Sequence, residues 1–281
     1  MTTLEPRLGE RQVEFVHPTI GAVVHGVDAR QPLDDDTLAF VRQAIFDHKA
    51  IVLPDQHLDL EQQQRFSDQF GEAWIHPVAD GYPDFEWLVS QSTTRIRADN
   101  WHADATFVEE PPAGSILQLT VVPPVGGDTL FADLEAAYDG LSPQLQALVD
   151  DLTVYHDGEN FQDWAWGPNV SDEERARILA LTARKVEHPL VHVIPETGRK
   201  SLYSVTGFAR KIKGLSDEES KGLLALLYAH VNRPEYIFRH NWTAGDIVFW
   251  DNRTVLHRAA NDYGDAPRKL QRTTIKSFRS N

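Results

Sequence analysis

The chain has 281 residues, 41% hydrophobic and 25% charged, which are proportions typical of a soluble globular protein. It contains no cysteine, which excludes disulfides and thiolate ligands, so any bound metal must take nitrogen and oxygen donors. The net charge of −15 argues against a nucleic-acid partner, because that binding depends largely on Lys and Arg. No apolar run is long enough for a membrane span and the N-terminus lacks a signal-peptide pattern, so we expect a cytoplasmic protein with no membrane partner.

The charge is distributed unevenly along the chain. Residues 253–281 carry a net charge of +5, whereas the first 252 residues carry −20. A cationic segment in an acidic protein is either an accident of the surface or a receptor for small anions.

Hydrophobic periodicity and turn residues predict the elements in chain order. Helices are expected to begin near residues 34–36, to run from residue 59 or 60 to Phe70, and to begin at Ser142-Pro143 and at two capping boxes, Ser171-x-x-Glu174 and Ser216-x-x-Glu219. Strands are expected within residues 12–26 and at 50–53, 85–90, 115–122, 128–132, 189–193, 236–240, 247–250 and 270–278. The intervening segment 157–170 is predicted to be a loop, in which Phe161, Trp164 and Trp166 either pack on the core or form a lid over a pocket.

Many short strands, with helices at the start and inserted midway, favour a mainly β (α+β) protein with a β-sandwich or jelly-roll core. Residues 100–132 and 236–278 lack the regular strand–helix alternation of an α/β fold, and no Gly-rich phosphate loop follows a strand. We find no internal repeat or linker, so a single domain over residues 1–281 is expected.

The stretch 99–107, Asp-Asn-Trp-His-Ala-Asp-Ala-Thr-Phe, holds the first candidate site. If it is extended, His102 and Asp104 project from the same face of a strand and can occupy two adjacent corners of a metal site. Two His and one carboxylate form the facial triad of non-haem Fe(II) oxygenases. His-x-Asp alone is a common chance pattern, so the assignment depends on a third ligand.

His257 is the candidate third ligand, because an apolar strand and a polar Asp-Asn-Arg turn lead directly into it. Arg268 and Arg272 follow, and their even separation places them on one face if they lie on a strand. Two guanidiniums close to a metal ligand can bind a carboxylate beside the metal.

A combination of motifs in this order resembles the taurine dioxygenase family of Fe(II)- and 2-oxoglutarate-dependent oxygenases, which also includes chlorophenoxyacetate dioxygenases and alkyl sulfatases. The resemblance covers about residues 10–278. The motifs are Asn100-Trp101-His102-x-Asp104-x-Thr106-Phe107, Pro111-Pro112-Ala113, Gly126-Gly127-Asp128-Thr129, Ala136-Ala137-Tyr138, Trp250-Asp251-Asn252-Arg253, His257 and Arg268-x-x-x-Arg272.

The resemblance implies a double-stranded β-helix (jelly-roll, cupin-like) fold and a role for each matching residue. His102, Asp104 and His257 would bind Fe(II), and Arg268 and Thr129 would bind the distal carboxylate of 2-oxoglutarate. Arg272 would bind the substrate anion with His76 beside it, and Phe107 and Phe208 would line the substrate pocket.

Two positions depart from the taurine enzymes. Ala98 replaces an Asn that lies four residues before the first iron-binding His, and the aromatic segment 161–166 is unlike theirs. We therefore expect a small anionic substrate (a sulfonate, sulfate ester or carboxylate) that is larger or more apolar than taurine.

Three protein ligands would leave room on iron for O2 and for 2-oxoglutarate, which binds through its keto oxygen and C1 carboxylate. The expected products are succinate, CO2 and a hydroxylated substrate. One alternative is a Zn²⁺ hydrolase that uses the same ligands to activate water, but hydrolysis gives no role to Arg268 or Thr129. A second is a non-catalytic jelly-roll binding protein, although all three ligands are present in this sequence. Members of the family commonly associate, so a homodimer or homotetramer is expected.

Overall fold

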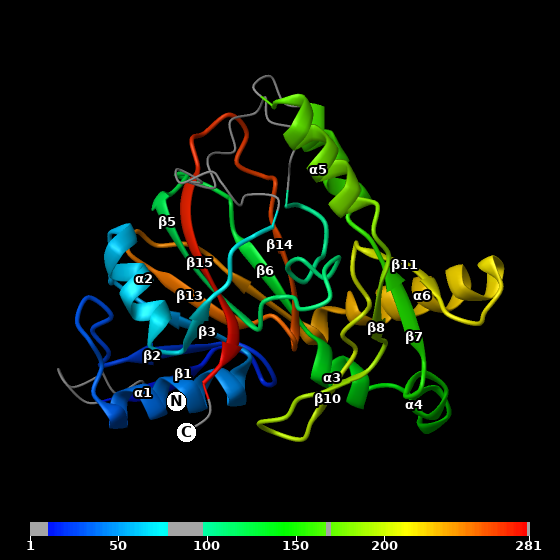
Figure 1. The fold of residues 1–281 in the computed structure, drawn as a ribbon. Helices are drawn as coiled ribbons and strands as arrows, with labels where there is room; N and C mark the ends of the chain where they lie inside the picture. Colours follow the sequence, from blue (N-terminus) through cyan, green and yellow to red (C-terminus); the bar gives the residue numbers. More distant parts are fainter. Residues whose placement is uncertain (1–10, 78–97, 167–169, 280–281) are drawn as a thin grey trace.

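A seven-stranded sheet lies at the centre of the computed structural model, which describes residues 11–77, 98–166 and 170–279 (Figure 1). Its strand order is β1-β2-β3-β13-β5-β15-β4, and all neighbours are antiparallel except β2 and β3. The strands are β1 (Gln12–Phe15), β2 (Ala22–His25), β3 (Ala50–Leu53), β4 (Gly71–Ala73), β5 (Gly114–Val121), β13 (Ile247–Asp251) and β15 (Lys269–Phe278).

Three smaller sheets complete the described β-structure. A three-stranded sheet has the order β12-β6-β14, a second has the order β11-β7-β8, and β10 pairs with β9. Their bounds are β6 (Thr129–Asp133), β7 (Thr153–His156), β8 (Val186–Pro189), β9 (His192–Val193), β10 (Lys200–Ser201), β11 (Ala209–Ile212), β12 (Ile237–His240) and β14 (Val255–Ala259).

The helices lie around the sheets (Figure 1). They are α1 (Asp35–His48), α2 (Leu60–Asp68), α3 (Leu134–Asp139), α4 (Pro143–Val149), α5 (Asp172–Thr182) and α6 (Asp217–Val231), with 3₁₀ helices η1 (Glu159–Trp166) and η2 (Pro234–Tyr236). Side-chain caps explain where several begin: Asp34 accepts from the Thr37 amide at α1, and Asp59 forms a full capping box with Gln62 at α2.

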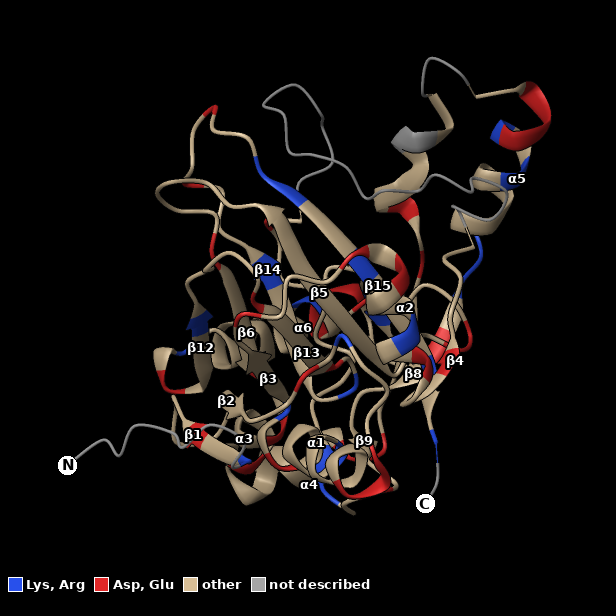
Figure 2. Ribbon diagram, turned by 90° about the vertical axis from the view of Figure 1, so that its left-hand side faces the viewer, with Lys and Arg blue, Asp and Glu red and all other residues tan. Residues whose placement is uncertain are grey.

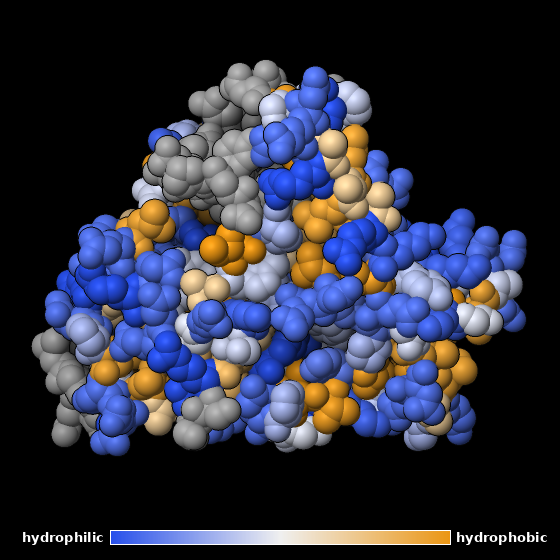
Figure 3. All heavy atoms as spheres, viewed as in Figure 1, coloured by the Kyte–Doolittle hydropathy of each residue, from blue (hydrophilic) through white to orange (hydrophobic). Residues whose placement is uncertain are grey.

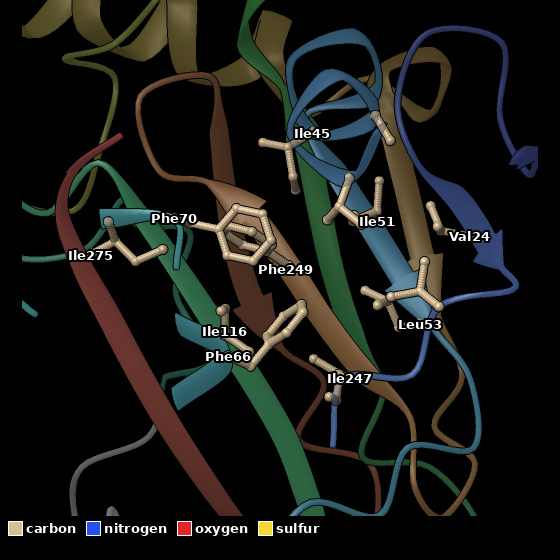
Figure 4. Close-up of a cluster of buried hydrophobic side chains, with 14 of the residues drawn as sticks. Val24, Ile45, Ile51, Leu53, Phe66, Phe70, Ile116, Ile247, Phe249 and Ile275 are labelled. Carbon is tan, nitrogen blue, oxygen red and sulfur yellow. The ribbon is translucent and has the colours of Figure 1, made fainter. Parts of the chain in front are cut away.

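The central sheet is covered on both faces at β3 and β13, so these strands are almost wholly apolar and side-chain alternation decides which core each residue joins. On β13, Ile247 and Phe249 point to one core, whereas Val248 and Trp250 point to the other. Helices α1 and α2 cover the first face, where Phe66 packs edge-on against Phe70 (Figure 4).

The second face of the central sheet packs against the sheet β12-β6-β14. Phe131 of β6 lies between Phe238 of β12 and Trp250 of β13, with ring centroids 6.0 and 5.5 Å apart. Two facing sheets with helices on the outside are the architecture that the strand pattern predicts. The candidate metal ligands lie at the edge of this inter-sheet core.

Most expected elements are present, and the exceptions involve irregular segments. The predicted loop at 157–170 contains η1, so that prediction was wrong for most of the segment. The predicted strand at 189–193 is divided between the end of β8 and β9, and β4, β7, β10, β11 and α3 were not predicted. Ser216 forms a full capping box, but Ser171 only accepts from the Glu174 amide, and the expected strand 85–90 lies outside the described residues.

The face shown in Figure 3 is largely polar, with smaller hydrophobic areas between the polar ones. Blue segments on β14 and β15 in Figure 2 belong to the basic C-terminal part of the chain. Within the described ranges, no helix has both the length and the apolar character to cross a membrane.

Candidate metal centre

Three side chains from two distant parts of the sequence meet at one point. One ligand atom from each of His102, Asp104 and His257 lies within 4.8 Å of the others. His102 and His257 are held together by a two-residue antiparallel bridge, in which the amides of His102 and His257 donate to each other's carbonyl at 3.1 and 2.8 Å. The backbone therefore holds the two histidines side by side whether or not a metal is bound.

Asp104 reaches the same point from a turn and not from a strand, so the expected extended conformation of this stretch holds only at His102. The carboxamide of Asn252 accepts from the Asp104 amide at 2.7 Å and donates to the Asp104 carbonyl at 3.1 Å. The Asn252 side chain thus makes the two hydrogen bonds that a neighbouring strand would otherwise make with the Asp104 backbone. The next residue, Ala105, adopts a φ of 51°. The side chains converge as expected, but by a different backbone path.

The two oxygens of the Asp104 carboxylate have different partners. Oδ1 lies 3.4 Å from Nε2 of His257 and 3.8 Å from Nε2 of His102. Oδ2 accepts from the Ser115 hydroxyl at 2.8 Å and is paired with Nη2 of Arg272. Nδ1 of His102 donates to the Asn100 carbonyl at 2.8 Å, which leaves the lone pair of its Nε2 available for a metal.

Burial and neighbouring charges set the protonation states. Burial and the nearby His257 lower the pKa of His102 to about 4. Burial acts to raise the pKa of Asp104, but Arg272 and the two imidazoles outweigh it, and this pKa lies well below its usual range. At neutral pH the cluster therefore offers a neutral His102 imidazole and an ionised carboxylate, as a divalent metal requires.

Arg268 is a buried cation next to the same core. It is 5% exposed, its Nε donates to the Gly127 carbonyl at 3.1 Å, and burial lowers its pKa. No carboxylate within salt-bridge distance of Arg268 is found in the described part of the chain. Gly127 has a φ of 75°, and a Cβ there would lie 3.3 Å from Cδ of Arg268, so a glycine is needed at this point of the chain.

Thr129 lies two residues after Gly127 and faces the inter-sheet core. The register of β6 and β14 pairs Thr129 with Ala259 and Phe131 with His257, so Thr129 and His257 lie on the same face. The Thr129 hydroxyl accepts from Nε1 of Trp242 at 3.0 Å, which leaves its own proton free to be donated to another acceptor. Arg268 and Thr129 are thus linked through one short turn.

The structure separates Arg268 from Arg272 more than the even spacing predicts. Arg268 precedes β15 and contacts the turn at Gly127, whereas Arg272 lies within β15 opposite Leu117 and reaches Asp104. The two cations therefore contact different parts of the site, the turn at Gly127 and the carboxylate of Asp104.

The expected substrate residues His76, Phe107 and Phe208 form one aromatic group. Phe107 lies 5.8 Å from His76 and 5.5 Å from Phe208, measured between ring centroids. Phe161 joins them, 5.1 Å from Phe107 and 5.5 Å from His76. Burial and Arg272 lower the pKa of His76 to about 4, which places this ring near the Arg272 guanidinium as a neutral group.

The aromatic segment 161–166 is divided in its contacts. Phe161 packs into the aromatic group, whereas Trp166 is 65% exposed and lies against Arg175 of α5. The side chain of Trp164 lies outside the described residues. A lid made by all three rings remains a prediction.

Two residues at the centre were not assigned a role from the sequence. Ser115 contacts the Asp104 carboxylate and Asn252 holds the Asp104 backbone. Asn252 belongs to a polar turn after a buried strand, and a polar residue there is a signal of a buried hydrogen-bonding role. Ser115 also had a signal, because it is polar at a position of β5 that shares its face with Leu117 and Leu119.

The sequence matches the taurine catabolism dioxygenase TauD, TfdA family over residues 12–274. It is 38% identical over 265 residues to an alkylsulfatase of Acinetobacter baylyi, which covers 91% of this chain and 82% of that protein. It is 37% identical over 269 residues to an alpha-ketoglutarate-dependent sulfate ester dioxygenase of Pseudomonas putida, with 92% and 88% covered. The chain belongs to this family. A crystal structure of a taurine dioxygenase from Burkholderia xenovorans is 36% identical and superimposes with a TM-score of 0.77, covering 94% of this chain and 90% of that one.

These matches confirm the expected family, the jelly-roll fold class and the enzyme class. The protein is an oxidoreductase, a dioxygenase dependent on alpha-ketoglutarate (2-oxoglutarate), whose class uses Fe(II), 2-oxoglutarate and O2. The donor set fits this metal, because two imidazole nitrogens and one carboxylate oxygen match the ligands of non-haem Fe(II). The buried Arg268 fits the dianionic co-substrate.

Proposed function

We propose that this enzyme hydroxylates an organic sulfate ester or a related anion with an apolar chain, at the carbon next to the leaving oxygen. One observation carries the proposal: Arg272, which is paired with Asp104 of the metal cluster, also lies near His76, a member of the aromatic group that includes Phe107. An amphiphilic anion needs both surfaces. Relatives described as an alkylsulfatase and a sulfate ester dioxygenase support this substrate class.

In this proposal His102, Asp104 and His257 hold Fe(II), and Arg268 and Thr129 hold the distal carboxylate of 2-oxoglutarate. When bound, iron and 2-oxoglutarate supply the oxidising power that hydroxylates a C–H bond, with succinate and CO2 as co-products. Arg268 has no carboxylate within salt-bridge distance in the described ranges and Asp128 acts on it only from farther away, so a dianion would neutralise a buried charge. The donated proton of Thr129 completes the same carboxylate site.

Arg272 binds the substrate anion, and the aromatic group holds its chain. The Arg272 side chain is 23% exposed although its Nη2 is paired with Asp104. His76, neutral at pH 7, can add a hydrogen bond without repelling Arg272. Each methylene buried against Phe107, Phe161 and Phe208 contributes roughly 0.8 kcal/mol, which favours chains longer than that of taurine.

Hydroxylation next to a sulfate ester gives an unstable product that collapses without further catalysis. The new hydroxyl group and the sulfate share one carbon, so the C–O bond breaks, the hydroxyl proton is lost and an aldehyde and inorganic sulfate result. One O2 is consumed, one oxygen atom enters succinate and the other enters the aldehyde.

The test is a comparison of anions in the purified enzyme with Fe(II), 2-oxoglutarate and O2. We expect succinate and sulfate to be released in equal amounts from hexyl and octyl sulfate, and much less succinate with taurine. Best turnover with taurine would contradict the chain-length argument. Full activity of Arg272→Ala on every anion would contradict the assignment of the anion site, and succinate that does not depend on O2 would contradict the oxygenase mechanism.

We also propose that the protein associates into a homodimer or homotetramer and acts in the cytoplasm. Light scattering of the purified protein tests the first, and a fractionation of cells tests the second.

A further inference from the structure

The carboxylate of Asp104 depends on a serine that has no assigned role. The Ser115 hydroxyl donates to Oδ2 of Asp104 at 2.8 Å, and Nη2 of Arg272 donates to the same hydroxyl at 3.4 Å. Ser115 is fully buried, at 0% exposed. Its hydroxyl is therefore committed to these two charged groups and is not shared with solvent.

The backbone of Ser115 is held more firmly than that of Asp104. Ser115 lies on β5, paired on one side with Trp250 of β13 and on the other with Thr274 of β15. Asp104 lies in a turn, and the hydrogen bonds of its own backbone are made with the side chain of Asn252. Ser115 therefore has the better-fixed backbone of the two, and its hydroxyl orients the carboxylate of Asp104.

A hydroxyl at this position is costly unless it has a function. The next residues of β5 on the same face, Leu117 and Leu119, belong to the inter-sheet core. Burying a hydroxyl among apolar side chains is unfavourable without a hydrogen-bond partner. Asp104 is that partner, so the hydrogen bond that compensates for burying the Ser115 hydroxyl is made at the candidate metal centre.

If Arg272 binds the substrate, it must interact with two anions. It is paired with Oδ2 of Asp104, and the proposed function requires it to bind the substrate anion as well. When Arg272 turns toward the substrate, Oδ2 loses one of its two donors, and Ser115 is the donor that stays. Oδ1, which faces the two imidazoles, then keeps its position.

We propose that Ser115 is a positioning residue that holds Oδ2 of Asp104, so that the carboxylate presents Oδ1 to the metal while Arg272 binds the substrate anion. This proposal rests on the proposed function of the same site. It predicts separate effects on the metal and on the substrate anion, because the serine contacts both Asp104 and Arg272.

The first measurement is metal affinity without substrate or 2-oxoglutarate, by titration of the full-length protein with Mn²⁺ followed by electron paramagnetic resonance. Ser115→Ala is expected to weaken Mn²⁺ binding about 10- to 100-fold, the usual effect of losing a hydrogen bond to a metal ligand. Ser115→Thr keeps the hydroxyl and is expected to restore most of the affinity.

Ser67→Ala is the matched control. Ser67 is a buried serine of α2, 1% exposed, and its hydroxyl has no partner among the described residues. It is expected to bind Mn²⁺ within twofold of the wild type. Ser115→Ala with wild-type Mn²⁺ affinity would overturn the proposal.

The second measurement separates positioning from a general loss of structure. In Ser115→Ala the KM for the anionic substrate is expected to rise about tenfold, since a carboxylate without its serine holds Arg272 more tightly, while the KM for 2-oxoglutarate stays within twofold. An equal rise in both KM values would overturn the assignment. If Ser115→Ala does not fold, Ser115→Cys keeps the volume with a weaker donor. Weaker Mn²⁺ binding by Ser115→Cys would then support the proposal and unchanged binding would overturn it.

Failure of the proposed function gives a different result. A wild-type protein that binds neither Mn²⁺ nor Fe²⁺, or that releases no succinate, would refute the function itself. A wild-type protein that binds metal with the same affinity as Ser115→Ala would refute only the role of the serine.

Discussion

The two halves of the site are built from different kinds of structure. On the metal side, His257 lies in the middle of β14, His102 is bridged to it, and Ser115 lies on a central strand of the large sheet. On the substrate side, Phe107 lies in a turn and Phe161 in a 3₁₀ helix. Strand pairing fixes the two candidate imidazole ligands and side-chain hydrogen bonds hold Asp104 in its turn, whereas segments outside the two facing sheets provide Phe107 and Phe161 of the aromatic group.

The two halves are joined by a small polar cluster behind the turn. Nε2 of His188 lies 2.8 Å from the Thr106 carbonyl and 3.0 Å from that of Val108, and Nδ1 of His156 lies 3.0 Å from the Thr106 hydroxyl. Thr106 lies between Asp104 and Phe107 in the sequence. The sheet β11-β7-β8 therefore supports a candidate metal ligand and an aromatic wall residue at once.

Removing a metal ligand is expected to have the largest effect on turnover of all the substitutions on either side of the site. Asp104→Ala or His257→Ala is expected to lower turnover at least about 1,000-fold, because the loss of metal chemistry costs several kcal/mol of transition-state stabilisation. The readout independent of turnover is the weak visible charge-transfer band formed by Fe(II) and 2-oxoglutarate without oxygen, which should disappear. A normal band in these variants would show that the ligands are others.

Arg268→Ala is expected to raise the KM for 2-oxoglutarate about 100-fold, because a buried carboxylate would lose its cation. Arg268→Lys should recover only part of the affinity, since an ammonium cannot form the two parallel hydrogen bonds of a guanidinium. Mn²⁺ affinity measured without 2-oxoglutarate serves as the control and should not change. An unaltered KM in Arg268→Ala would transfer the role to Arg272.

The polar cluster that joins the two halves is expected to make the free energy of unfolding depend on pH. Burial lowers the pKa of His156 to about 3, so between about pH 6.5 and pH 3 the unfolded chain binds a proton there that the folded chain does not. Stability is therefore lost as the pH falls through this range. His156→Gln is expected to remove about 2 kcal/mol of the difference in unfolding free energy between pH 7 and pH 4.5, measured with urea on metal-free protein. The same pH dependence in variant and wild type would contradict this account.

A substitution in the aromatic group on the substrate side is expected to leave the metal affinity unchanged. Phe161→Ala is expected to raise the KM for octyl sulfate about tenfold through lost apolar contact, with a smaller effect on hexyl sulfate. Mn²⁺ affinity and the KM for 2-oxoglutarate should stay within twofold of the wild type. A change in Mn²⁺ affinity as large as the change in KM would show that the two halves are not separable.

The sequence by itself indicated the main strands, the family and the candidate residues of the metal site. Short runs rich in apolar residues and bounded by turn residues identified β5 and β13, because a strand that is buried on both faces has few polar residues. His102, Asp104 and His257 are recognisable because few residue types bind Fe(II), and they occur in a fixed order along the chain.

Only the tertiary structure decided how these residues meet. Asp104 takes its position in a turn because Asn252, 148 residues later in the chain, binds its backbone, and no local pattern contains that contact. The position of Phe161 beside Phe107 depends likewise on the packing of segments that are distant in sequence. Hydrogen bonds and aromatic contacts of this kind act at a few ångströms, so they exist only once the sheets have brought those segments together.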